Sequence, residues 1–160
     1  MSVASETPRP RRGRPPKDPN SAETRCKLIR TGLIYLTERG YSSVGVDEVL
    51  TKSGVPKGSF YHYFRSKADF GETLIEEYNV YFLAKLDEAF ADTTKPAMDR
   101  LRAFTQDAQE GMARHGYRRG CLIGNLGQEM AALPEEFRER LKRVLAQWQD
   151  RVADCLNDAQ

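Results

Sequence analysis

The stretch SGVPKG, residues 53–58, limits more than any other feature how this chain can fold. Its two glycines and its proline separate two helices, because glycine tolerates turn conformations and proline cannot continue a helical hydrogen-bond ladder. Apolar residues recur at helical spacing on both sides of the break. The pattern predicts two short helices, over residues 46–52 and 57–64, joined by a tight turn.

The rest of the sequence also has helical periodicity, and none of it alternates as a half-buried strand would. We expect a first helix that Asn20 caps and Gly40 stops. A long helix follows Ser66, whose hydroxyl is expected to form a capping box with Asp69. The pattern therefore predicts an all-α protein.

Three further helices are expected, starting at Pro96, at Gly120 and at Pro134. The middle one covers residues 120–131 and contains two glycines, which cost helix stability, so we expect close packing against a neighbour there. The apolar stripes of the long and later helices are predicted to face the core. They comprise Phe70, Leu74, Tyr78, Tyr81, Phe82, Leu86, Phe90, Met98, Leu101, Phe104, Met112, Phe137, Leu141, Val144, Leu145, Trp148, Val152, Cys155 and Leu156.

Length and composition exclude several classes of protein. The 160 residues are 39% hydrophobic and 30% charged, which is typical of a globular protein of one domain or two small ones. The sequence has no apolar run of membrane-spanning length and no apolar secretory signal, so we expect a cytoplasmic protein without membrane contact. Three scattered cysteines and two histidines predict neither a disulfide framework nor a metal site, and no cofactor is expected.

Charge is distributed unevenly along the chain. Residues 1–67 carry 13 Lys/Arg against 6 Asp/Glu, whereas residues 68–160 carry 12 against 17. A basic front half and an acidic back half indicate a polyanion-binding domain joined to a second unit. The two short helices belong to the basic half.

Residues 1–19 form a basic, proline-rich segment that cannot bury a core, and we expect a disordered arm. It contains RGRP, with Arg12 and Arg14 on either side of a glycine. Such a motif fits a narrow A·T minor groove, where the negative potential attracts arginine. The alternative is a basic tail that adds only unspecific attraction to phosphates.

The second short helix has the dimensions and chemistry of a DNA-reading helix. About eight residues span ~12 Å, close to the width of the major groove. Phe60 and Phe64 share one face and are expected to anchor the helix, which leaves the other side chains for DNA. The predicted DNA-binding residues are Lys57, Gly58, Ser59, Tyr61, His62, Tyr63 and Lys67, with Arg12 and Arg14 of the arm. The alternative, an aromatic-rich core helix with solvated lysines, is less consistent with the glycine turn and the basic front half.

The stretch GYSSVGVDEVLTKSGVPKGSFYHYFRSKADF, residues 40–70, strongly resembles the TetR family of transcriptional regulators. The resemblance implies a three-helix DNA-binding domain, here residues 20–82, joined by a long fourth helix to a helical effector-binding and dimerisation domain, residues 83–160. It further implies a homodimer on a palindromic operator of double-stranded DNA, usually a repressor released by a small-molecule effector. Because family members usually end with two more long helices, the second domain is expected to be partial.

The second half also resembles members of that family. Residues 110–141 are similar to regulators that respond to acrylate or to electrophiles, which implies an effector of that kind. The candidate pocket residues, with plain core as the alternative, are Tyr78, Tyr81, Phe82, Phe104, Met112, Asn125 and Trp148.

Cys121 is the candidate sensor of such an effector. It follows two arginines at a predicted helix start, and both features favour a reactive thiolate. In electrophile-responsive relatives a cysteine in this context is associated with sensing; the alternative is a buried, inert thiol. Arg114, Arg118 or Arg119 are candidates to bind a carboxylate of the effector. Cys26 and Cys155 are expected to be structural.

Two other functions compete with a ligand-responsive regulator. His115 and Cys121 suggest a base and a nucleophile, but no third group to orient them accompanies the pair, so we do not expect an enzyme. An architectural DNA-binding protein would use the arm and the short helices without any effector. An effector that changes DNA affinity would separate the regulator from the architectural protein.

Overall fold

The computed structural model describes residues 19–157, which form seven α-helices and a 3-10 turn and, within that range, no strand. The prediction of an all-α fold is confirmed. The arm with Arg12 and Arg14 lies outside the described residues. The elements are α1 (Pro19–Arg39), α2 (Val46–Ser53), α3 (Lys57–Tyr63), α4 (Lys67–Phe90), α5 (Ala97–Ala113), α6 (Leu122–Gln128), η1 (Met130–Ala132) and α7 (Glu135–Asn157).

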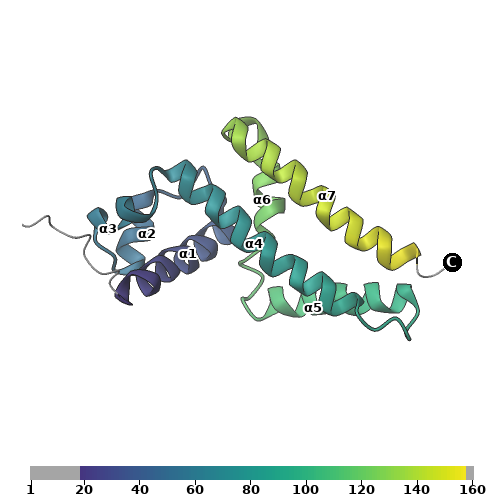
Figure 1. Ribbon diagram of the computed structural model, residues 1–160. Helices are drawn as coiled ribbons and strands as arrows, with labels where there is room; N and C mark the ends of the chain where they lie inside the picture. Colours follow the sequence, from purple (N-terminus) through teal and green to yellow (C-terminus); the bar gives the residue numbers. More distant parts are fainter. Residues whose placement is uncertain (1–18, 158–160) are drawn as a thin grey trace, which may run out of the picture.

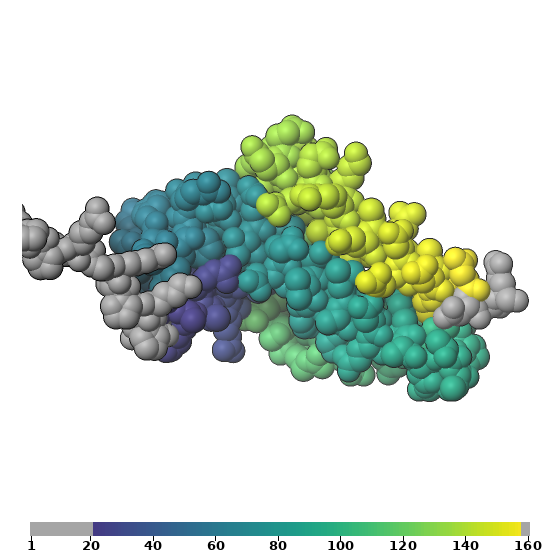
Figure 2. Space-filling model, viewed as in Figure 1, coloured from purple at the N-terminus to yellow at the C-terminus, as the bar shows by residue number. Residues whose placement is uncertain are grey.

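Helix α4 runs through the length of the molecule and joins its two parts (Figure 1). Helices α1, α2 and α3 gather around its N-terminal half, α5 accompanies its C-terminal half, and α7 runs along most of its length. The short helix α6 lies at the junction, in contact with both α1 and α4. In the space-filling view, α7 lies along α4 over one side of an elongated body (Figure 2). None of the helices within residues 19–157 is long and apolar enough to cross a membrane.

Local signals set the ends of the first helices. Gly40 and Gly54 have φ values of 79° and 68°, the left-handed region in which glycine is favoured, and they end α1 and α2. Ser66 caps α4, because its hydroxyl accepts a hydrogen bond from the Asp69 amide at 3.0 Å. The Asp69 carboxylate accepts from the amide of Arg65 at 2.8 Å, whereas a standard capping box would use the amide of Ser66 itself. The predicted capping box therefore forms in a variant that is shifted by one residue.

Two clusters of buried side chains hold the fold together. The main core cluster joins α1–α4 to α6 and the first half of α7, and it includes Phe60 and Phe64, which confirms their role as anchors. Its other members include Leu28, Leu36, Val49, Phe70, Leu74, Ile75, Leu122, Leu126, Phe137 and Leu141. The distal cluster, Leu86, Phe90, Ala97 and Cys155, joins the far ends of α4, α5 and α7.

Several predicted core positions are wrong. Tyr81, Met98, Met112, Leu145 and Leu156 are exposed, because neighbouring helices cover a narrower face than the apolar stripes occupy. Similarly, Cys26 is exposed, although Cys155 is buried as predicted. At the N-terminus α1 begins at Pro19, so Asn20 lies within the first turn and not before it.

The glycines of the predicted 120–131 helix do not pack closely, which corrects that expectation. The segment divides into α6 and η1. A Cβ built on Gly127 would meet nothing within 4 Å, and one on Gly124 would meet only Cys121 of its own turn at 3.6 Å or more. Close packing occurs instead at Gly32 and Gly71, where a Cβ would overlap aromatic side chains. Helix α6 therefore carries two glycines without compensating contacts.

Candidate functional site

Helices α2 and α3 with their connecting turn, residues 46–63, form a helix-turn-helix whose two faces differ sharply. Phe60 is fully buried and meets the ring of Phe70 edge to face, with centroids 5.3 Å apart. Tyr61, its neighbour, is 54% exposed, and Lys57, Gly58 and His62 are also exposed. Ser59 and Tyr63 are half-buried, and Tyr63 packs partly against the main core cluster. The anchored helix thus presents cationic and aromatic groups outward.

Lys57 lies at the leading end of α3. Its ammonium is 2.9 Å from the Asp47 carboxylate in the first turn of α2, and both side chains are exposed. The hydrogen bond and the charge of Asp47 raise the pKa of Lys57, so the ammonium stays protonated. A Cβ built on the adjacent Gly58 would meet nothing within 4 Å, which leaves this end of α3 open to a close approach.

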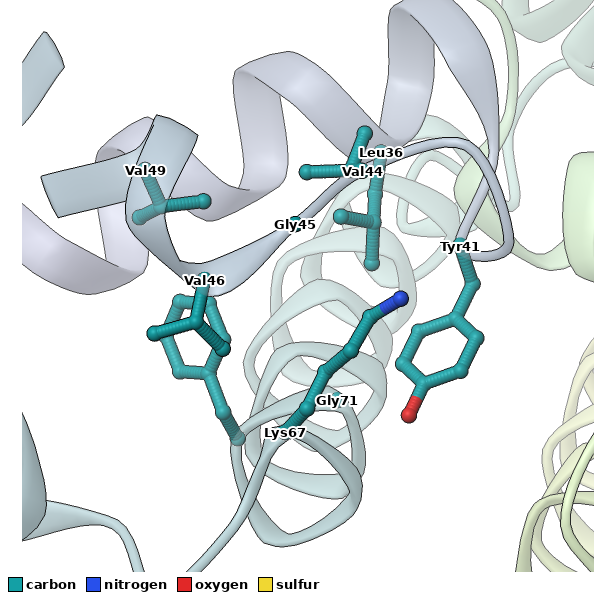
Figure 3. A pocket seen from close by; sticks show the side chains of 9 residues that line it. Leu36, Tyr41, Val44, Gly45, Val46, Val49, Lys67 and Gly71 are labelled. Atoms are coloured by element: carbon teal, nitrogen blue, oxygen red, sulfur yellow. The ribbon is translucent and has the colours of Figure 1, made fainter. Parts of the chain in front are cut away.

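Lys67, a predicted phosphate contact, is half-buried in this structure. Its ammonium lies 4.3 Å from the centroid of the Tyr41 ring and points into a small gap between α4 and the loop after α1 (Figure 3). Burial lowers the pKa of Lys67, and the charge of Glu129 opposes that shift. In this structure the side chain belongs to the junction around Tyr41 and not to the exposed face of α3.

A cavity of about 430 Å³ lies between the end of α1, the middle of α4, helix α5 and the loop after α5. Of the predicted effector residues, Tyr78, Tyr81, Phe82, Phe104, Met112 and Cys121 line it. The other lining residues are Thr37, Lys85, Asp107, Ala108, Gly111, Arg114, His115, Arg119 and Gly120. Sequence periodicity gave no signal for Thr37, which comes from α1 and reaches the cavity only through the tertiary fold.

Aromatic rings form the apolar wall of the cavity. Tyr78 stacks on Phe82 with centroids 6.1 Å apart, and Phe82 meets Phe104 edge to face at 5.7 Å. Trp148 does not line the cavity but stacks behind Phe82 at 3.8 Å, with its indole N–H donating to Asn79 at 2.8 Å. Phe82 therefore separates the only tryptophan of the chain from the cavity.

Asn125, which was predicted to line the pocket, also lies outside the cavity lining. Its amide nitrogen donates to the carbonyl oxygens of Leu36 at 3.2 Å and Thr37 at 2.9 Å. These carbonyls belong to the last turn of α1, where the Leu36 carbonyl also accepts from the Gly40 amide at 3.0 Å and the Thr37 carbonyl from the Gly120 amide at 2.9 Å. Asn125 thus adds hydrogen bonds to the end of α1 and ties α6 to it.

Charged groups surround the aromatic wall. Lys85 and Asp107 pair at 3.5 Å on one side, and Arg119 pairs with Glu38 at 3.1 Å on the other. Arg114 is an exposed lining residue, whereas Arg118 is exposed and does not line the cavity. Such a site, apolar with a few polar groups at its edge, is suited to binding a small organic molecule.

Cys121 and Tyr78 lie side by side in the cavity wall. The thiol sulfur of Cys121 accepts a hydrogen bond from the Gly124 amide at 3.4 Å. Burial, and then the neighbouring Cys121 side chain, raise the pKa of the Tyr78 phenol above its ordinary value. Among residues 19–157 no group of His, Cys, Asp and Glu side chains could hold a metal ion.

Two family models match the sequence. Residues 28–72 match "Bacterial regulatory proteins, tetR family", and residues 97–160 match "Tetracyclin repressor-like, C-terminal domain". The first match contains the helix-turn-helix, and the second contains α5 and the loop after it, which form one side of the cavity.

Individual relatives agree with these matches. The chain is 60% identical over 152 residues to the transcriptional regulator AcuR of Cereibacter sphaeroides, covering 95% of this chain and 69% of that protein. It is 35% identical over 121 residues to the transcriptional repressor NemR of Escherichia coli K12, covering 76% of this chain and 61% of NemR. The crystal structure of a regulatory protein TetR from Rhodobacter sphaeroides superposes with a TM-score of 0.83 at 61% identity, covering 86% of this chain and 72% of the other.

Proposed function

The chain belongs to the TetR family of DNA-binding transcriptional regulators, and we propose from this that it is a repressor that leaves its operator when a small molecule fills the cavity. The observation that carries the proposal is the cavity of about 430 Å³, which borders both α1 and the α4 helix that follows the helix-turn-helix. A ligand there contacts the elements that position α2 and α3. The name of the relative NemR, a repressor, supports the direction of regulation.

The DNA-binding side of the proposal rests on α3. Its N-terminal end enters the major groove, with Lys57, Gly58 and Ser59 leading and with Tyr61 and His62 available to phosphates or base edges. Tyr63 and Lys67 contribute after side-chain rearrangement, since both are partly buried here. A homodimer would place two such helices on a palindromic operator, and the RGRP arm would add minor-groove contacts.

We assign the effector to acrylate or a related small unsaturated carboxylate. Arg114 at the cavity edge, or Arg119 if it leaves Glu38, supplies a partner for the carboxylate. Cys121 supplies a nucleophile: its thiol loses its proton to water, its sulfur forms a bond to the β-carbon, the π electrons move to the α-carbon, and that carbon takes up a proton from water. The effector domain in this proposal comprises residues 83–160, and the DNA-binding domain residues 20–82.

The experiment that tests the function is a DNA-binding titration on the region upstream of the chain's own gene, with and without acrylate. Footprinting should protect two symmetric half-sites, and acrylate should weaken the binding. Mass spectrometry should show an acrylate adduct on Cys121 that the Cys121→Ser variant lacks. DNA binding that acrylate and other unsaturated carboxylates leave unchanged would favour the architectural alternative.

A further inference from the structure

Glu129 joins the junction helix to the loop that carries α2. It follows the last residue of α6, and its two carboxylate oxygens accept hydrogen bonds from the backbone amides of Tyr41 at 3.0 Å and Ser42 at 2.7 Å. Those amides lie in the short loop between α1 and α2. One side chain of the effector half thus holds the backbone of the DNA-binding half across 87 residues of sequence.

The contact at Glu129 has a counterpart at the other end of α6. The amide of Gly120 donates to the carbonyl of Thr37 at 2.9 Å, and Asn125 donates to the same carbonyl at 2.9 Å. Helix α6 therefore holds the last turn of α1 at its N-terminal end and the following loop at its C-terminal end. Both attachments are hydrogen bonds to backbone, so a shift of α6 must either break them or move the α1–α2 connection.

The cavity reaches this attachment directly. Thr37, Gly120 and Cys121 are lining residues, so a ligand would contact α6 at its start and α1 at its end. Helix α6 itself is short, and Gly124 and Gly127 lower its intrinsic helix stability. Leu122, Ile123 and Leu126 bury one face of α6 in the main core cluster, so a ligand beside it would shift the helix as a unit.

We propose that Glu129 is a positioning residue for DNA binding: its carboxylate fixes the α1–α2 loop in the DNA-binding arrangement, and a ligand-driven shift of α6 withdraws it. The inference rests on the proposed function for the ligand-driven step. Gly40 is part of the same device. It has a positive φ, and a Cβ there would overlap the Glu129 carboxylate, so the loop is shaped to receive this side chain.

The proposal predicts changes of opposite sign in the two affinities. If the held and withdrawn arrangements are in equilibrium, Glu129→Ala favours the withdrawn one. Operator affinity, which follows the held fraction, should then fall about tenfold, and acrylate affinity, which follows the withdrawn fraction, should rise. Trp148, which stacks on the cavity residue Phe82, reports acrylate binding by its fluorescence. Glu129→Gln retains one acceptor oxygen and should give a smaller change in the same directions.

A matched control separates positioning from general loss of stability. Glu72→Ala removes a carboxylate that also accepts two hydrogen bonds, here from the Arg140 guanidinium at 2.6 Å and 2.9 Å, and that joins α4 to α7 and not to the loop. This variant should leave operator affinity within about twofold of wild type. Native-state hydrogen exchange should show faster exchange of the Tyr41 and Ser42 amides in Glu129→Ala but not in Glu72→Ala.

The outcomes decide the proposal in each case. A loss of operator affinity with a gain of acrylate affinity supports it, whereas a parallel loss of both shows that Glu129 is merely structural and overturns it. If wild type fails to respond to acrylate, the proposed effector is wrong, and the role of Glu129 is then decided by operator affinity and hydrogen exchange alone. An operator affinity about tenfold lower, with fast exchange at residues 41 and 42 and an unchanged melting temperature, still supports the positioning role. Unchanged operator affinity and unchanged exchange overturn it.

Discussion

The helix-turn-helix and the cavity are built in opposite ways. The helix-turn-helix is a single contiguous stretch, residues 46–63. In its second helix the buried Phe60 lies beside exposed groups that are able to contact DNA. The cavity takes its wall from positions as far apart as Thr37 and Cys121, on three helices and a loop. The first site is set by local sequence, and the second exists only once the tertiary fold has brought its parts together.

The two sites also depend on different parts of the core. Phe60 of the helix-turn-helix lies in the main core cluster, which holds most of the large buried side chains. Of the cavity residues, Phe82 and Phe104 pack against the smaller distal cluster and Tyr78 and Cys121 against the main core cluster, so the cavity lies across both clusters. The helix-turn-helix should therefore be the more rigid site, and the cavity should adapt more readily to what it binds.

The largest change in stability is expected for Phe60→Ala, which tests whether α3 is anchored in the main core cluster. Its ring is fully buried, and removal of a buried phenylalanine costs about 3–5 kcal/mol of unfolding free energy, part of it from the cavity left behind. Urea denaturation measures that loss. Tyr61→Ala, which removes the exposed neighbouring ring, is the control and should change the unfolding free energy by about 0.5 kcal/mol or less. Equal effects of the two variants would mean that α3 is not anchored through Phe60.

Asn79→Ala should act on the cavity side and have a smaller effect. Asn79 is buried between α4 and α7, where it accepts from the Trp148 indole and donates to Gln147 at 2.8 Å. The substitution leaves the indole N–H without its partner, at a cost of about 1–3 kcal/mol. Trp148 emission should shift as its stacking on Phe82 loosens. The helix-turn-helix should retain its DNA affinity; if that affinity falls as much as effector affinity does, the two sites are not separable.

The difference between the two sites explains what the sequence could predict. The break at residues 53–58, the spacing of Phe60 and Phe64, and the cap at Ser66 are local signals, and they predicted the helix-turn-helix nearly to the residue. The cavity depends on which face of each helix finds a partner. Periodicity therefore placed Phe82 in the lining correctly but could not distinguish it from Trp148, one ring behind.

The contacts that the sequence did not predict also have identifiable physical causes. Lys67 has the spacing of a phosphate-binding lysine, yet in the structure its stem crosses an apolar gap and its ammonium meets the Tyr41 ring, a contact between segments that no local pattern encodes. Glu129 gave no signal either, because an isolated glutamate in an acidic half looks like a solvated side chain. Its role is visible only from the backbone amides that it reaches.

A moderate effect on DNA binding alone is expected for Lys57→Gln. The ammonium at the start of α3 is exposed and would neutralise one phosphate, so its loss should lower the slope of log affinity against log salt by about 0.9. Lys27→Gln is a matched control, because Lys27 is an exposed lysine on α1 that pairs with Glu23 at 2.8 Å. Fluorescence anisotropy across a salt series distinguishes them. An unchanged slope for Lys57→Gln would remove this end of α3 from the interface.

The smallest expected effects are pH effects that separate the two sites. The amide of Arg65 lowers the pKa of Asp69 below its usual 3.8, so Asp69 adds stability above that pH and loses it as the pH falls further. Burial raises the pKa of Tyr78 above its usual 10.0, so the contribution of its neutral phenol is complete below pH 10 and decreases as the pH rises beyond it. Asp69→Asn should therefore flatten the acid limb of a stability–pH profile by less than about 1 kcal/mol, because the group is partly solvated. Tyr78→Phe should flatten only the alkaline limb. If either substitution altered both limbs, the α4 start beside the helix-turn-helix and the cavity wall would titrate as one unit, and the contrast between a local and an assembled site would fail.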